Sequence, residues 1–261
     1  MELHCSGCGA QISADLEKGI GKCRYCGNEI LLEKKHVFGN LERFAVRQEE
    51  LPQVPNPKYI SWEDSGLKDH AMDWKDEALE AGMRKVTGIT QGDIMLSDVF
   101  PMTSLTLNGE GIHNVDALNE LTNLQSLVLE SNYITDISGL KNLKNLVFLN
   151  LFINRVVNIG GIAHMPLLRD VRLDYNQVSD LTPLKDLKYI ERLYVYMNIV
   201  RDVSPLKNLI SLKDLRLDFN PLRDISALEG LRYLESLNIE RTEVEDLNPI
   251  INLKNLKTLC K

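Results

Sequence analysis

The sequence predicts an α/β solenoid that is mainly β, with a curved parallel sheet, a helical N-terminal cap and a small four-cysteine module. The first observation is a 22-residue period from residue 102 to the end of the chain. The second is a pair of Cys-x-x-Cys-Gly motifs within residues 1–35. The third is a set of helix-start and helix-stop signals in residues 61–101. A linker is predicted at residues 36–60.

The repeat can be read directly from the spacing of its aliphatic residues. With Leu124 as position 1, the pattern is L-x-x-L-x-L-x-x-N-x-I-x-D-I-x-x-L-x-x-L-x-x, in seven full repeats and a partial strand without an insertion. Position 4 is aliphatic throughout, as Leu105, Leu127, Leu149, Val171, Leu193, Leu215, Leu237 and Leu259. One repeat cannot bury these side chains alone, so neighbouring repeats must stack around a shared core.

Position 9 carries a polar residue inside this apolar pattern. It is asparagine in five successive repeats, as Asn132, Asn154, Asn176, Asn198 and Asn220. A buried amide is costly unless it is hydrogen-bonded. We therefore expect each asparagine to bond backbone groups where the coil turns away from its strand.

These residues resemble the leucine-rich repeats of the internalin type. In that family L-x-x-L-x-L forms a short strand, and the rest of the repeat forms a turn and a short convex element. The resemblance covers residues 102–261. It implies a curved parallel sheet that binds other proteins.

Composition limits the remaining possibilities. The chain has 261 residues and a net charge of −7, and it has no apolar run of about 18 residues that could span a bilayer. The segment Met1–Cys5 lacks the apolar region of a signal peptide, so we expect a soluble cytoplasmic protein. That differs from the secreted internalins, whose host-receptor function is therefore not transferred here.

The N-terminal motifs predict a metal site. Cys5 and Cys8 form one motif, Cys23 and Cys26 form the other, and each motif is followed by glycine. Four thiolates at this spacing are typical of a closed, structural Zn²⁺ site. The segment resembles the zinc ribbons at the N-termini of many bacterial proteins, with strands expected near residues 11–12 and 29–32.

Two other interpretations of the cysteines remain open. Two disulfides would need an oxidising compartment, which the absence of an export signal does not favour. Iron in a rubredoxin-like site uses similar motifs. One structural zinc ion is the prediction.

The segment before the repeats contains a linker and helical signals. Pro52, Pro55 and Pro57 interrupt regular structure in the linker. Ser61 and Asp76 are positioned to start helices, and Gly88 to end one. Leu79, Met83 and Val86 form the expected buried stripe, and Trp62 and Trp74 are expected in the core of this segment. The segment resembles the helical N-terminal cap of internalin-type proteins.

The candidate binding residues follow from strand geometry. Positions 4 and 6 point into the core, so positions 3, 5 and 7 point outward onto the concave face, and position 8 follows at the strand exit. Large side chains gather there in the middle repeats, beside two arginines. These residues, called here the concave set, are Phe148, Phe152, Tyr175, Tyr194, Tyr196, Met197, Phe219, Arg172 and Arg216. An exposed aromatic patch rimmed by charge is typical of a protein-binding surface.

A less specific interpretation is that the aromatic residues pair across the sheet and are half-buried by its curvature. Asp174 and Asp218 are expected to pair with neighbouring arginines rather than to act as acids or bases. No catalytic constellation is recognisable, because the five histidines are scattered and no phosphate-binding loop is present. We therefore predict that the chain is not an enzyme.

The predicted function is a cytoplasmic scaffold or adaptor that binds a protein partner through the concave face. One alternative is nucleic-acid binding through the zinc ribbon, which the equal numbers of acidic and basic residues in residues 1–35 do not favour. Another is a targeting subunit of an enzyme supplied in trans. The final strand, residues 256–261, carries Lys257 and Lys261, which could blunt an open sheet edge, so a monomer is expected.

Overall fold

The computed structural model describes residues 52–261 in full and, of residues 1–51, only the backbone of three strands. These strands, β1 (Ile12–Asp15), β2 (Ile20–Cys23) and β3 (Glu29–Leu31), form an antiparallel sheet in that order. Of the four predicted metal ligands, Cys5, Cys8 and Cys26 lie outside the described residues, as does most of the predicted linker, residues 36–51. Cys23 is the last residue of β2.

The repeats form a single parallel sheet of eight strands in sequence order. The strands are β4 (Ser104–Thr106), β5 (Ser126–Val128), β6 (Phe148–Asn150), β7 (Asp170–Arg172), β8 (Arg192–Tyr194), β9 (Asp214–Arg216), β10 (Ser236–Asn238) and β11 (Thr258–Cys260). Leu127 pairs with Leu105 on one side and with Leu149 on the other. One 22-residue period therefore advances the chain by one strand, which confirms the predicted solenoid.

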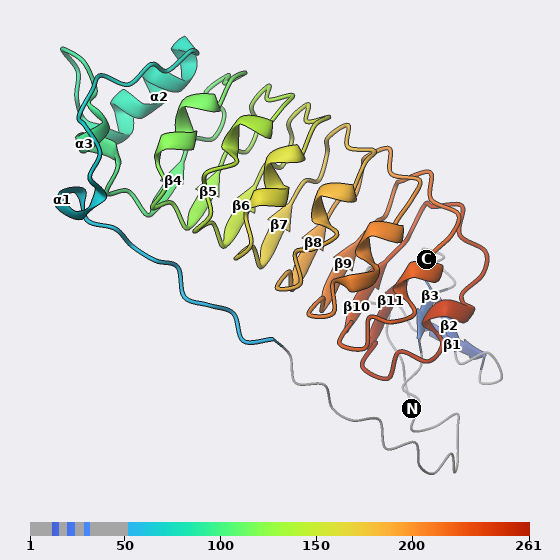
Figure 1. Ribbon diagram of the computed structural model, residues 1–261. Coiled ribbons are helices and arrows are strands. Elements are labelled where there is room, and N and C mark those ends of the chain that lie inside the picture. The colour runs from blue at the N-terminus through green and yellow to red at the C-terminus, as the bar shows by residue number, and fades with distance from the viewer. Residues whose placement is uncertain (1–11, 16–19, 24–28, 32–51) are drawn as a thin grey trace.

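Each strand from β4 to β10 is followed by a turn and a short 3₁₀ helix on the opposite side of the solenoid (Figure 1). The helices are η2 (Asp116–Glu120), η3 (Ser138–Leu140), η4 (Gly160–His164), η5 (Thr182–Leu184), η6 (Ser204–Asn208), η7 (Ser226–Leu228) and η8 (Asn248–Ile250). They occupy the convex element that the repeat pattern predicts. A 22-residue coil leaves room there for about one turn of helix.

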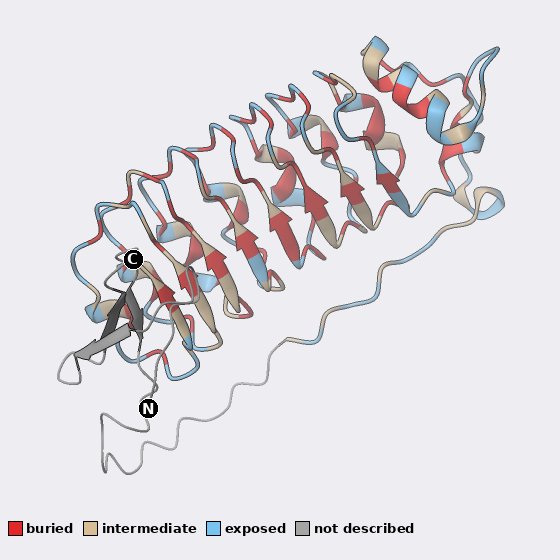
Figure 2. Ribbon diagram, turned by 180° about the vertical axis from the view of Figure 1, so that it is seen from behind, coloured by how far each residue is buried: buried red, intermediate tan, exposed pale blue. Residues whose placement is uncertain are grey.

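The core is a continuous band between the strands and the 3₁₀ helices (Figure 2). Leu149 and Leu151, at positions 4 and 6 of one repeat, have no exposed surface. The same holds for Val156 and Ile162, at positions 11 and 17. The aliphatic columns therefore make one shared core, as the period predicts.

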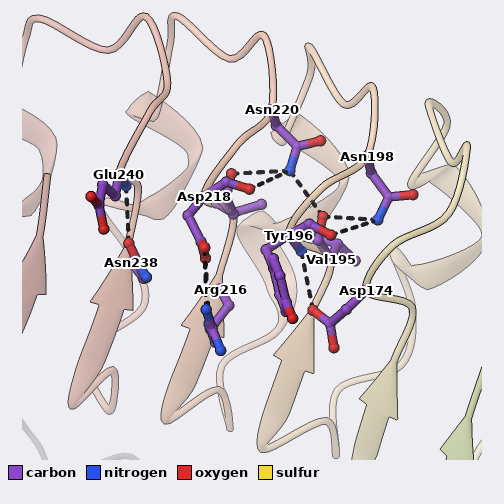
Figure 3. A network of polar contacts seen from close by, with 10 residues as sticks. Asp174, Val195, Tyr196, Asn198, Arg216, Asp218, Asn220, Asn238 and Glu240 are labelled. Atoms are coloured by element: carbon purple, nitrogen blue, oxygen red, sulfur yellow. Dashed lines mark hydrogen bonds and ion pairs between the residues drawn. The ribbon is translucent and has the colours of Figure 1, made fainter. Parts of the chain in front are cut away.

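The asparagine column bonds the backbone where each coil leaves its strand. Asn176 Nδ2 donates to Leu151 O at 2.9 Å and to Leu173 O at 3.0 Å, and its Oδ1 accepts from Val156 N at 2.8 Å. Asn198 and Asn220 repeat this arrangement one and two coils further on (Figure 3). The predicted role of position 9 is confirmed: each side chain joins its own coil to the coil before it.

Helices precede the sheet. They are α1 (Trp62–Ser65), α2 (Glu77–Thr87) and α3 (Leu96–Val99). Ser61 accepts a hydrogen bond from Asp64 N, Asp76 accepts one from Leu79 N, and Gly88 ends α2 at φ 75°. In the described part of the chain, no helix is long and apolar enough to cross a membrane.

One residue of the expected buried stripe on α2 is exposed to solvent. Leu79 and Met83 have no exposed surface, whereas Val86 is 47% exposed, so its assignment to the core was wrong. Val86 lies in the last turn of α2. Trp74 is buried, and Trp62 packs edge-on against Phe100, 5.6 Å between ring centroids.

Side-chain amides fix the described end of the predicted linker. Asn123 bonds both backbone groups of Ile60, with Oδ1 accepting from N and Nδ2 donating to O at 2.8 Å each. Asn145, one repeat later, bonds N and O of Lys58 at 2.9 Å each. Residues 58–60 therefore lie along the solenoid at these points, which the proline spacing did not predict.

At the other end of the solenoid, β3 lies beside β11 (Figure 1). The described strands of the two sheets are not joined by backbone ladder pairing.

Candidate functional site

The middle of the concave face has a repeated charge pattern. Asp-x-Arg-x-Asp occurs on β7 as Asp170, Arg172 and Asp174, and again around β9 as Asp214, Arg216 and Asp218. Between them lie Arg192 and Tyr194 of β8, and Tyr196 two residues after the end of that strand. Because the strands pair in register, these residues form three rows across three neighbouring strands.

Three of the four aspartates named above are buried, although the sequence predicted a charged rim, and Asp214 has intermediate exposure. Asp170, Asp174 and Asp218 are 5%, 3% and 2% exposed. Aspartate is short, so the longer aromatic and arginine side chains of adjacent strands cover it. The negative charge of these aspartates is therefore covered, whereas the Arg172, Arg192 and Arg216 side chains remain 40%, 52% and 37% exposed.

Both arginines of the concave set are held between rings and carboxylates. The Arg172 guanidinium lies 5.5 Å from the ring centroids of Phe148 and Tyr194, and its Nε is 3.5 Å from Asp170 Oδ1. The Arg216 guanidinium lies 4.2 Å from the Tyr196 ring centroid and pairs with Asp218 at 3.2 Å. Stacking and ion pairing at once fix a guanidinium and neutralise it.

Several of the aromatic residues are only half-buried, which agrees with the less specific interpretation given above. Phe148, Phe152, Tyr194 and Tyr196 all have intermediate exposure. The Tyr194 hydroxyl donates to Asp214 Oδ2 at 2.6 Å, and burial together with this bond raises the Tyr194 pKa to about 12. These four side chains therefore contribute to the structure of the sheet as well as to its surface.

The row at the strand exits is different. Its large apolar members in four successive repeats, called here the strand-exit row, are Ile153, Tyr175, Met197 and Phe219. Their exposed fractions are 45%, 43%, 38% and 46%. Their φ angles are 54°, 53°, 53° and 55°, in the left-handed region. At the same position in the first repeat the chain has Gly109, at φ 69°.

A left-handed backbone costs a non-glycine residue roughly 1–2 kcal/mol, and a β-branched residue such as Ile153 adopts it least readily. Glycine or asparagine would fit the turn at lower cost. The left-handed conformation recurs at this position in every full repeat, including Ser131 at φ 57° and Arg241 at φ 58°, so the coil itself requires it. The core does not require a large exposed apolar side chain there, and the strand-exit row has one in four successive repeats. Sequence reasoning named three of its residues but missed Ile153 as a site residue and missed the strain altogether.

Asp174 has the least compensated charge on this face. In the described part of the chain it takes part in no ion pair, so its expected pairing with an arginine was wrong; Asp218 does pair with Arg216. From neighbouring strands its carboxylate receives one hydrogen bond, from Tyr196 N to Oδ1 at 3.2 Å (Figure 3). Burial raises the Asp174 pKa to about 7, an effect that Arg216 only partly offsets.

Taken together, the coils, the asparagine column and the parallel sheet define a leucine-rich-repeat solenoid. No protein-family model and no curated protein matches the chain. Among solved structures it is similar to internalin C2 from Listeria monocytogenes str. 4b F2365, with 28% identity, a TM-score of 0.56, and coverage of 71% of this chain and 93% of that one.

It is also similar to the leucine-rich-repeat protein LIC12759 of Leptospira interrogans, at 24% identity and a TM-score of 0.57. That match covers 62% of this chain and 43% of the Leptospira chain, and it bears on the fold alone. The chain therefore has an internalin-like leucine-rich-repeat fold.

Proposed function

We propose that this chain is a non-enzymatic, cytoplasmic protein-interaction module that binds a protein partner through the concave face of its repeats. The strand-exit row is the observation that supports this most strongly. Four large apolar side chains stand in a strained backbone conformation, exposed to solvent, in consecutive repeats. A contiguous apolar surface that the fold does not need is typical of a binding interface.

The charges on the same face favour a protein over a nucleic acid. Arg172 and Arg216 each lie against aromatic rings and beside a carboxylate, Asp170 or Asp218, which lowers the positive charge that they present to a phosphate. The chain as a whole carries a net charge of −7. Phosphate binding needs a surplus of unpaired positive charge.

The test is to replace Met197 and Phe219 by asparagine, which is polar and tolerates the left-handed conformation. Stability should be unchanged or higher, because strain is relieved and no core contact is lost. Binding to the partner, isolated by affinity purification from the native host, should weaken by at least tenfold, since a buried apolar anchor contributes about 2 kcal/mol.

The matched control replaces Val157 and Ile251 by asparagine. These side chains are 51% and 43% exposed and lie outside the strands, so the same number of apolar groups is removed away from the concave face. Partner binding should be unaffected. If the control variant lost the partner, or the Met197 and Phe219 variant retained it at full affinity, the concave face would not be the binding site.

We further propose that Cys5, Cys8, Cys23 and Cys26 hold one structural zinc ion. The second pair supports this through its place in the fold, since Cys23 ends β2 and Cys26 falls in the connection to β3. The first pair precedes β1. Two Cys-x-x-Cys pairs, one before β1 in the sequence and one beginning at the end of β2, suit a tetrahedral four-thiolate site.

Native mass spectrometry of the full chain should show one zinc ion per molecule. The Cys5→Ser and Cys8→Ser double variant should lack it, because two thiolate ligands are removed. Iron in stoichiometric amount, or disulfides that survive a reducing buffer, would replace this assignment with one of the two alternatives.

We also propose that residues 61–101 act as the N-terminal cap of the solenoid. Leu79 and Met83 of α2 belong to the same buried cluster as Leu105 of the first coil. A solenoid needs such a cover, because its first coil otherwise exposes a cross-section of the core.

A further inference from the structure

Three aromatic residues are the neighbours of Asp174 along its row and along the chain. Phe152 and Tyr196 occupy the same row as Asp174 on the neighbouring strands, one on each side. Tyr175 follows Asp174 in the chain, and its ring meets both of these rings edge-on, with centroids 5.6 Å from Phe152 and 5.1 Å from Tyr196. Asp174 as a residue is 3% exposed.

The other buried carboxylates of this face have cationic partners within the chain. Asp170 has Arg192 Nε at 2.6 Å, and Asp218 has Arg216 Nη2 at 3.2 Å. Asp174 has neither arginine within ion-pairing distance among the described residues. Burying a carboxylate without a counter-ion costs free energy, and a serine or asparagine would fit the same place without that cost.

From this arrangement we propose that Asp174, with the rings of Phe152, Tyr175 and Tyr196, receives a lysine or arginine side chain from the bound protein. This rests on the proposed function and names the chemistry of the partner: a basic peptide segment. A carboxylate supplies the missing charge complement, and aromatic faces attract a cation within about 6 Å of their centroids. Both interactions are stronger in a site from which water is excluded.

The charged groups around Asp174 leave room for one added positive charge. Asp170 and Arg172 lie on β7, Arg192 lies on β8 and pairs with Asp170, and Asp214, Arg216 and Asp218 come from β9 and the residues after it. Three arginines therefore face three aspartates besides Asp174. On β6 the facing residues, Asn150 and Phe152, are uncharged. The net local charge with Asp174 ionised is negative, so a cation is attracted and an acidic segment is repelled.

The test starts with a random peptide library displayed on phage and selected on the immobilised full chain at about pH 8, where the carboxylate is ionised. The recovered peptides should share a lysine or arginine at one position. One such peptide is then synthesised, and its dissociation constant is measured by fluorescence anisotropy. Asp174→Asn should weaken its binding by about tenfold or more.

Two controls test whether the loss of affinity comes from the contact between Asp174 and the basic residue of the peptide. Glu240→Gln removes one negative charge from the same row outside the ring cluster, and it should leave the affinity within about twofold. Replacing the shared basic residue of the peptide by norleucine should cause the same loss as Asp174→Asn, with no further loss when both changes are combined. The peptide change also tests the contact without altering the fold.

Lowering the pH should weaken binding of the basic peptide to the wild-type chain, because Asp174 takes up a proton below a pKa of about 7. The Asp174→Asn variant should lack this dependence between about pH 6 and about pH 8.

The outcomes separate this proposal from the proposed function. Peptides without a shared basic residue, or basic peptides indifferent to Asp174→Asn, would overturn the cation contact. If those peptides were still lost on replacing Met197 and Phe219, the concave face would remain the binding site. A selection that returns no peptide sensitive to either variant would count against both proposals.

Discussion

At the residue scale, Asp174 shows a conflict between folding and charge. Its pKa is about 7 in the folded protein, against 3.8 for an unperturbed carboxyl, because burial disfavours the ionised form. A carboxyl whose pKa is raised on folding favours the folded state when protonated. As the pH rises from about 4 through about 7, Asp174 loses its proton in the unfolded chain before it does so in the folded protein. The free energy of unfolding therefore falls over this pH range.

Asp174→Asn should therefore stabilise the protein in alkaline solution. Its free energy of unfolding, relative to the wild type, should increase by about 2 kcal/mol between about pH 5 and about pH 8. Urea denaturation at both pH values, followed by circular dichroism, measures this. Glu240→Gln serves as the control and should show no such increase. A wild type and Asp174→Asn variant with parallel stability profiles would mean that Asp174 ionises normally.

The periodicity of the sequence correctly predicted which face of the sheet a residue lies on. It did not predict how far neighbouring strands cover that residue. The alternation along a strand placed Tyr194 and Arg216 on the concave face. It could not show that Asp218 would be covered by longer side chains, because coverage depends on the adjacent strands. Nor could it show the left-handed turn at Phe219, because an aromatic residue carries no signal for that conformation.

At the element scale, the asparagine column connects each coil to the next. Asn176 alone bonds Leu151 O, Leu173 O and Val156 N, all of them buried. Asn176→Ala leaves these groups without their partner, and each buried unsatisfied group costs about 1–3 kcal/mol. We expect a loss of about 3 kcal/mol or more in the free energy of unfolding.

Asn142→Ala is the control for that change. Asn142 is an exposed residue whose backbone N–H donates a hydrogen bond to Asn119 Oδ1 at 2.8 Å, so truncating its side chain leaves that bond in place. Its replacement should cost under about 0.5 kcal/mol. Chemical denaturation of both variants measures the difference, and similar values for the two would show that position 9 is not a structural bridge.

Helices and strands could be predicted where the local sequence contains capping or periodic residues, whereas contacts between distant residues could not. The ends of α2 were predictable because Asp76 caps its N-terminus with its side chain and Gly88 ends it in the left-handed conformation. The alternating ion pairs before the strands, such as Arg169 with Glu191 and Lys213 with Glu191 at 2.9 Å, join residues 22 apart and were overlooked. The bonds of Asn123 to Ile60 cross 63 residues, a distance over which no local pattern operates.

At the scale of the whole molecule, the repeat fixes the architecture because each coil contacts chiefly its neighbours. The period alone therefore predicted strand order, register and core. It is silent on how the N-terminal sheet relates to the solenoid, since that relation lies outside the repeat.

The buried cluster of the solenoid consists of residues between Met72 and Leu259, most of them aliphatic residues of the repeats. We therefore expect the repeats to fold without the metal module. In the Cys5→Ser and Cys8→Ser double variant, the thermal midpoint of the repeats should stay within about 2 °C of the wild type, because none of the named core residues is altered.

Leu151→Ala, which opens a cavity at a fully buried position, should instead cost about 2–5 kcal/mol in the free energy of unfolding. Circular dichroism melts of both variants and the wild type make the comparison. A large drop on loss of the metal would show that the two units are coupled, and the proximity of β3 to β11 names the place where that coupling would act.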